Sequence, residues 1–235
     1  MKKYELTNET MEIGTITLHR IKALVAFADV DVGELGGWVE KESNIDQDGD
    51  AWVSDDAIVS GDARVYDNAR VSGNARVYGN AWVYGDARVY GDARVYGDAW
   101  VSGYARVFDN ALVSGNAWVS GNDTVISSTS YLCVCPIGSR NDALTFTRDK
   151  NGRIFAKVGC FVGDISEFRA KVKETHGENI HAKAYLLAAQ LAEERIDTTP
   201  IEDDKGGGDD GFCRGNGSPG AADIFDDMLH FSGRW

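Results

Sequence analysis

Cysteine and histidine are the residue types in this chain that most readily bind a metal ion or supply a nucleophile and its base. Cys133, Cys135 and Cys160 precede His176 and His181 closely enough for one small domain to bring all five together. The C-x-C spacing differs from the C-x-x-C pairs of zinc ribbons and fingers, because it places both sulfurs along one strand. A pair of Cys160 and His176 would lack a third, orienting group. We therefore expect the cysteines to be small core residues, and we expect no metal, cofactor or catalytic residue.

A second candidate is the polar, turn-rich loop at residues 136–143, which carries Arg140. The arginine side chain forks onto carboxylate and phosphate groups, so Arg140 could hold an anionic ligand. In the simpler interpretation, which we favour, Asp142 pairs with Arg140 and the loop is a solvated turn. Arg140 is kept as a candidate binding residue.

The elements that must position these residues follow from a six-residue period between residues 50 and 127. Valine holds the fourth place of all thirteen hexads, from Val53 to Val125, and alanine holds the second place except at Asp123. A β-branched residue every six positions can form an inward stack, and a small residue two places earlier fits beside a corner. Gly followed by Asn or Asp supplies the turns. We predict a parallel β-helix over this segment.

The hexads resemble the hexapeptide-repeat superfamily, in which an aliphatic residue follows a small residue two places earlier, as in Ala51 and Val53. The segment 31–53 is similar to the entry into the helix in uncharacterised acyltransferase-like proteins of bacteria and phages. The resemblance covers roughly residues 15–127. It implies a left-handed, three-sided helix with three hexads, or about 18 residues, in each coil. A right-handed or irregular solenoid is the alternative.

The resemblance also raises the question of catalysis, because left-handed β-helix acyltransferases commonly use a histidine base, whose pKa lies near neutrality. The histidines of this chain are His19, His176, His181 and His230, and none lies within residues 50–127. The family's catalytic motif therefore has no position here. A hexapeptide-type acyltransferase using a small acyl donor stays the alternative to a non-enzymatic protein.

A coil of three hexads sorts the outward residues into columns, because residues 18 apart then stack at the strand spacing of about 4.8 Å. The first column is Trp82, Trp100 and Trp118; the second is Arg70, Arg88 and Arg106; the third is Ile58, Arg76, Arg94 and Leu112. A row of exposed tryptophans favours contact with a partner, although the row could also be satisfied by its own stacking. The arginine row needs counter-charge from neighbouring Asp side chains, a partner or an anion. We expect the first two columns and Arg140 to bind partners.

The fold class that we predict is mainly β: a left-handed parallel β-helix of hexapeptide repeats with an N-terminal cap and a small C-terminal α+β domain. The predicted parts are the N-terminal cap at 1–49, the β-helix at 50–127, the α+β domain at 128–196, an acidic Gly-rich linker at 197–222 and an amphipathic C-terminal tip at 223–235.

The parts outside the helix are predicted from local signals. A solenoid end exposes an apolar cross-section, so a cap is required, and residues 15–27 suggest strands within it. In the α+β domain, residues 131–162 predict a strand followed by a hairpin, whose turn contains Asn-Gly at 151–152. Asp164 with Glu167 forms a capping box for a helix to about residue 175, and a second helix is expected at 179–196.

Composition limits the partners, because the formal net charge is −13 and the pI is about 4.7. An acidic surface repels phosphate backbones, so we expect no direct nucleic-acid binding. No apolar run approaches the roughly 20 residues that span a bilayer, so we expect no membrane contact and a cytoplasmic protein. The function that we favour is a non-enzymatic scaffold or protein-interaction protein, phage-encoded and acting on a host protein in the host cytoplasm. Its expected partners are itself, as a dimer or trimer, and a second protein.

Overall fold

Each hexad folds as one two-residue strand followed by a turn, and the computed structural model describes these strands with the rest of residues 1–201. Met1–Ile201 form one compact unit. The predicted tip at 223–235, and the linker from residue 202 onward, lie outside the described residues. The repeat strands are β4 (Trp52–Val53), β5 (Ile58–Val59), β6 (Arg64–Val65), β7 (Arg70–Val71), β8 (Arg76–Val77), β9 (Trp82–Val83), β10 (Arg88–Val89), β11 (Arg94–Val95), β12 (Trp100–Val101), β13 (Arg106–Val107), β14 (Leu112–Val113), β15 (Trp118–Val119) and β16 (Thr124–Val125).

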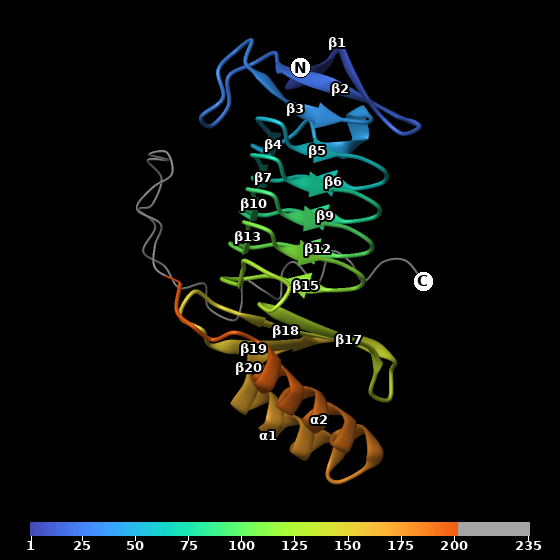
Figure 1. The fold of residues 1–235 in the computed structure, drawn as a ribbon, viewed down its shortest axis with the longest axis vertical. Coiled ribbons are helices and arrows are strands. Elements are labelled where there is room, and N and C mark those ends of the chain that lie inside the picture. Colours follow the sequence, from blue (N-terminus) through green and yellow to red (C-terminus); the bar gives the residue numbers. More distant parts are fainter. Residues whose placement is uncertain (202–235) are drawn as a thin grey trace. The chain divides into compact units, whose positions relative to one another are not determined.

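Every third strand belongs to the same face, so the hexads build three parallel sheets that run the length of the coil (Figure 1). Their orders are β4-β7-β10-β13-β16, β6-β9-β12-β15 and β5-β8-β11-β14. Trp100 pairs with Trp118 and Val101 with Val119, which is the register that the 18-residue coil predicts. The first of these sheets has five strands, one for each turn. The repeat region is therefore a parallel β-solenoid of about five turns.

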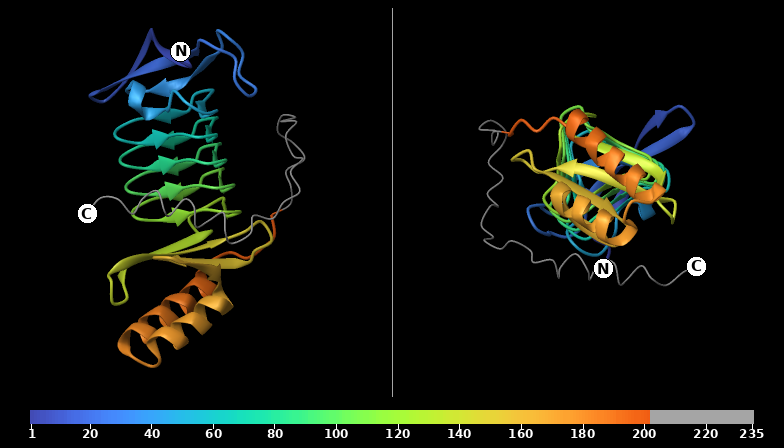
Figure 2. Two further views of the ribbon diagram at one scale, coloured as in Figure 1. Left: turned by 180° about the vertical axis from the view of Figure 1, so that it is seen from behind. Right: turned by 90° about the horizontal axis from the view of Figure 1, so that it is seen from below.

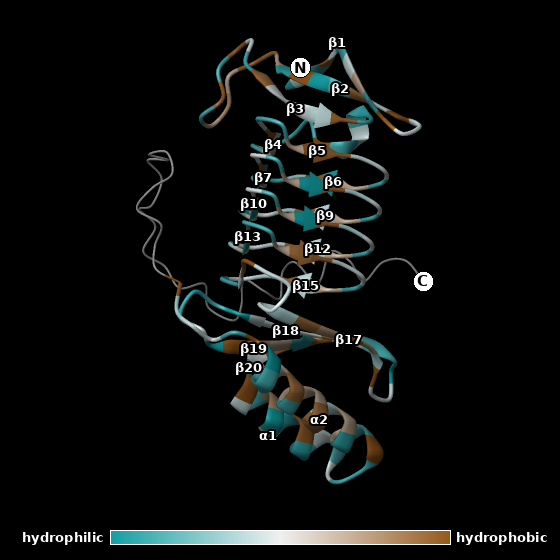
Figure 3. Cartoon of the chain, viewed as in Figure 1, coloured by the Kyte–Doolittle hydropathy of each residue, from teal (hydrophilic) through white to brown (hydrophobic). Residues whose placement is uncertain are grey.

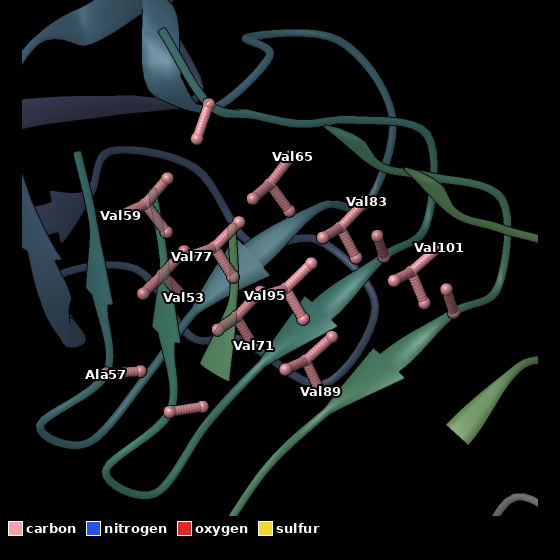
Figure 4. Packing of buried hydrophobic residues seen from close by; sticks show 14 of the residues in the cluster. Val53, Ala57, Val59, Val65, Val71, Val77, Val83, Val89, Val95 and Val101 are labelled. Carbon is pink, nitrogen blue, oxygen red and sulfur yellow. The ribbon is translucent and has the colours of Figure 1, made fainter. Parts of the chain in front are cut away.

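The interior of the solenoid is filled by the valine and the alanine of each hexad (Figure 4). In the middle of the stack, Val89 and Ala87 are both 0% exposed. Burying one valine side chain contributes roughly 1.5–3 kcal/mol to folding. Among the described residues from 51 to 119, no charged side chain is buried. The interior is therefore a packing core rather than a binding cavity.

The corners explain why the sixth place of the hexad is Gly or Asp. Gly79 has φ +74°, and a Cβ there would lie 3.0 Å from the backbone nitrogen of Gly97 one turn away. Asp67 adopts φ 58° at the equivalent place. Its carboxylate accepts a hydrogen bond from the Gly85 N–H at 3.2 Å. The aspartate therefore offsets its backbone strain with a bond to the next turn.

The N-terminal end is closed by β1 (Tyr4–Ile13) and β2 (Ile16–Ala23), an antiparallel pair, and by β3 (Leu35–Val39), which pairs with β2 and, in parallel, with β5. The strand-rich segment predicted at 15–27 corresponds to β2, whereas β1 was not predicted. A short 3-10 helix, η1 (Glu42–Asn44), leads into the first turn.

Donor groups meet the backbone carbonyls of the first turn, because each turn's carbonyls otherwise accept from the N–H groups of the turn before it. The ammonium of Lys3 donates to the carbonyls of Asp48, Gly49 and Ala51 at 3.2, 3.1 and 3.0 Å. Burial lowers the pKa of Lys3 to about 8. The amide of Asn44, which is 0% exposed, donates to the Ala63 carbonyl at 2.9 Å. These buried donors replace the missing turn.

The C-terminal module is an antiparallel sheet in the order β17-β18-β19-β20, with two helices across one face (Figure 2). Its elements are β17 (Tyr131–Ile137), β18 (Asp142–Arg148), β19 (Ile154–Val158), β20 (Phe161–Asp164), α1 (Ile165–His176) and α2 (Ile180–Arg195). The predicted capping box of Asp164 and Glu167 starts α1, which confirms that helix, and α2 begins after its N-cap Asn179. The strand and the hairpin predicted here are confirmed as β17 and the β18–β19 pair. A fourth strand, β20, was not predicted, and it joins the sheet because the chain turns again at residues 159–160.

The two faces of this sheet differ in chemistry because strand residues alternate. Leu144 and Phe146 of β18 pack against the helices. Thr145, on the other face, accepts a hydrogen bond at its Oγ1 from the backbone N–H of Trp118 at 3.0 Å. Cys133 of β17 packs against the solenoid core. One sheet therefore forms the core of the module and also covers the last turn of the solenoid.

Asp123 is the one residue at the second place of a hexad that is not alanine, and its contacts at this junction explain the exception. It is 3% exposed and its carboxylate bonds to the ammonium of Lys157, which is also 3% exposed. The same carboxylate accepts from the Ser120 N–H at 2.8 Å, and Lys157 donates to Thr147 Oγ1 at 2.9 Å. Burial lowers the pKa of Lys157, and the charge of Asp123 opposes that shift.

The described chain after α2 stays attached to the sheet. Arg148 is 0% exposed, and its guanidinium donates to the carbonyls of Asp197 and Thr199 at 2.8 and 2.6 Å. Ile201 N–H donates to the Lys150 carbonyl at 2.9 Å. Residues 197–201, which the sequence assigns to the linker, are therefore held by backbone contacts.

Candidate interaction surfaces

The tryptophan column forms as predicted. Trp82, Trp100 and Trp118 occupy successive strands in register, and the rings of Trp82 and Trp100 stack at 5.8 Å with an interplanar angle of 14°. Tyr66 packs edge-on against Trp82 at 6.0 Å. The expectation that these tryptophans are exposed is wrong, because all three are partly buried. Wide rings that lie on one another cover much of their own surface.

The arginine column also has the predicted register, from Arg70 through Arg88 to Arg106. Arg70 forms an ion pair with Asp29 of the N-terminal segment. Arg106 donates to the Tyr90 hydroxyl at 2.5 Å and lies 5.3 Å from the ring of Phe108. Arg88 lies between the two. Counter-groups within the chain therefore meet the charge at Arg70 and Arg106.

Arg140 is placed as the favoured interpretation expects. Its Nε lies 3.4 Å from Oδ2 of Asp142, and its side chain is 75% exposed. Arg140 lies in the turn between β17 and β18, and Asp142 is the first residue of β18. An exposed pair of this kind contributes little to stability.

The third face holds a pocket that we did not predict. The end of the β1–β2 hairpin contributes Ile13 and Ile16 to one side, and the sheet contributes Ile58, Arg76 and Arg94. The other lining residues are Leu18, Ser60 and Tyr78. Arg76 and Arg94 pair in register on β8 and β11, and both are exposed. Neither guanidinium has an ion pair with a carboxylate of residues 1–201.

Part of this pocket was visible in the sequence, because the 18-residue register already places Arg76 and Arg94 between Ile58 and Leu112. The position of the β1–β2 hairpin was not visible, since nothing in the repeat specifies where a non-repetitive strand pair lies.

Helix α2 carries a second surface that we did not predict. Ile180, Leu187 and Leu191 are 77%, 66% and 51% exposed, although the opposite side of the helix buries Ala182 and Ala189. Apolar residues are visible along α1 and α2 in Figure 3. The seven- and four-residue spacings of the exposed residues place them along one line of the helix. The spacing of these apolar residues in the sequence could have predicted the surface.

The cysteines and histidines do not assemble into a reactive centre in the described part of the chain. Cys135 and Cys160 are exposed, so the prediction that the cysteines are core residues is wrong for both. Cys133 is half-buried, and burial raises the pKa of its thiol. The rings of His176 and His181 lie 6.1 Å apart. Residues 1–201 contain no group of His, Cys, Asp or Glu side chains arranged to hold a metal ion.

Comparison with known families bears on the repeats. A family model described as the YdcK beta solenoid repeat matches residues 63–75, 69–85, 87–103 and 105–121. These repeats are similar to the YdcK-type β-solenoid repeat. The matched residues lie between β6 and β15, so the YdcK-type repeat describes the coil and not the N-terminal sheet or the C-terminal module. A search of curated proteins found no match to the chain. Within residues 1–201, no helix is long and apolar enough to cross a membrane.

Proposed function

We propose that this protein is a non-enzymatic scaffold that binds another protein at the pocket of the third face. The observation that carries the proposal is the pair of arginines, Arg76 and Arg94, which lie beside the apolar wall of the pocket. Neither arginine has a carboxylate partner within residues 1–201. The chain has 37 acidic residues against 24 basic ones. In an acidic protein, two neighbouring arginines that form no ion pair within residues 1–201 can together bind an anionic group.

The chemistry of the pocket indicates the kind of partner. Ile13, Ile16 and Ile58 offer apolar contact, while Arg76 and Arg94 can each fork onto a carboxylate. A protein segment that alternates acidic and apolar residues satisfies both. The pocket is bounded by an exposed strand hairpin and an open sheet face, which suits a peptide segment better than an enclosed small molecule.

The binding experiment uses the full chain as bait in the cells that naturally contain it, followed by identification and purification of the captured partner. We expect Arg76→Glu/Arg94→Glu to weaken binding of the purified partner by about tenfold or more. Arg64→Glu is the matched control, because Arg64 is also exposed at the third place of its hexad but lies on another face. Equal losses from both variants would contradict the proposal.

A melting experiment on the wild type and on the same double variant tests the acyltransferase alternative. A transferase would be stabilised by its donor, so acetyl-CoA would raise the melting temperature of the full chain. We expect no change. A rise that Arg76→Glu/Arg94→Glu abolishes would replace the protein partner with an acyl donor.

Two finer points belong to this proposal. The solenoid is left-handed, as the hexads with an aliphatic residue after a small one suggest. The protein is phage-encoded and acts on a host protein in the host cytoplasm, which the acidic surface and the resemblance of residues 31–53 support. An electron-density map of the repeat region would test the hand directly.

A further inference from the structure

Between Lys183 and Glu194, the exposed line of α2 is apolar in its middle and charged at its two ends. Leu187 and Leu191 form the middle, at 66% and 51% exposure. Lys183 lies four residues before Leu187, and Glu194 lies three residues after Leu191. Both charged residues are exposed, and neither forms an ion pair within residues 1–201.

A second copy of this segment that runs in the opposite direction presents matching residues, with apolar opposite apolar and positive opposite negative. If a second α2 lies antiparallel to the first, Leu187 faces Leu191 of the second copy. The same register brings Lys183 beside Glu194 of the second copy, and two-fold symmetry repeats each contact. A parallel arrangement would instead place lysine near lysine and glutamate near glutamate, which is unfavourable.

We propose that two copies of this chain form a dimer through antiparallel packing of their α2 helices. The contact removes Leu187 and Leu191 from water and pairs the two charged ends. It is independent of the arginine pocket, which lies on the β5-β8-β11-β14 face. The segment from Lys183 to Glu194 is only about 16 Å long, so the interface is smaller than that of a permanent dimer. The dimer should therefore dissociate on dilution.

Sedimentation equilibrium of the full chain over a wide range of concentrations measures the association. Leu187→Glu should abolish the dimer, since it puts a charge opposite Leu191. Lys183→Glu or Glu194→Lys alone should weaken the dimer about tenfold, because each creates two like-charge contacts. The double variant Lys183→Glu/Glu194→Lys should restore it, since the charges are exchanged. Circular dichroism of each variant checks that α2 still folds.

The control is Trp100→Glu, which changes the tryptophan column and leaves α2 intact. We expect this variant to dimerise like the wild type. A chain that stays monomeric at its highest soluble concentration would overturn the proposal. So would a dimer that Trp100→Glu dissociates and Leu187→Glu does not, or a double charge exchange that fails to restore association while the helix is folded.

Discussion

The two ends of the solenoid face opposite chemical problems. At the first turn the backbone carbonyls lack donors, and the chain supplies the ammonium of Lys3 and the amide of Asn44. At the last turn the backbone N–H groups lack acceptors, and the chain supplies Thr145 Oγ1 for Trp118 and the Asp123 carboxylate for Ser120. A parallel coil has a direction, so one end needs donors and the other acceptors. The caps therefore cannot be exchanged.

The largest expected effect is at the acceptor end. Asp123→Ala restores the residue of the repeat, yet it leaves the ammonium of Lys157 buried without its carboxylate. Breaking a buried pair in this way should cost about 3–5 kcal/mol of unfolding free energy. Chemical denaturation measures the loss. Asp123→Ala/Lys157→Met should recover most of it, and a double variant as unstable as the single one would show that the pair is not the cause.

At the donor end, the buried Lys3 should make the free energy of unfolding depend on pH. The pKa of Lys3 is about 8 in the folded chain and 10.5 in its ordinary state. The unfolded state therefore binds the proton more tightly, so the folded state bears a cost below pH 8 that disappears as pH rises to 10.5. The unfolding free energy of the wild type should rise relative to Lys3→Met by about 2–3 kcal/mol across this window. Parallel pH profiles for the two proteins would contradict the burial of a charged Lys3.

The smallest effect compares the middle of the coil with its acceptor end. The sequence alone predicts a frayed last turn, so that Val125→Ala would cost less than Val89→Ala. Both valines are 0% exposed, because the C-terminal sheet covers β16. We therefore expect similar losses of about 1–3 kcal/mol for the two variants in denaturant melts. A clearly smaller loss at Val125 would mean that the sheet does not close the coil.

The sequence predicts what the period and local chemistry control. The valine interval specifies the coil and its three faces, and the interval of 18 places Trp82, Trp100 and Trp118 on one face. The Asp164 and Glu167 pair similarly predicts the start of α1. These inferences work because each depends on residues at fixed short spacings.

Contacts between distant segments could not be predicted in this way. Asp123 is visible as an exception in the repeat, but its partner Lys157 lies on a strand of a different sheet. The approach of Ile13 to Arg76 depends on how the β1–β2 hairpin lies against the coil. The exposure of Leu187 depends on which side of α2 the module buries. Each requires the packing of non-repetitive parts, for which the sequence has no period.

Because the coil is built from whole hexads on three sheets, the distance between its two ends can change only in fixed steps. Losing three hexads would remove one rung, bring the ends closer by about 4.8 Å and keep every face aligned. Losing a single hexad would instead rotate one end against the other by about a third of a turn, since three sheets complete each circuit. The arginine pocket is fixed near the donor end and α2 near the acceptor end. The number of hexads therefore sets both the distance and the rotation between a partner bound at the arginine pocket and one bound at α2.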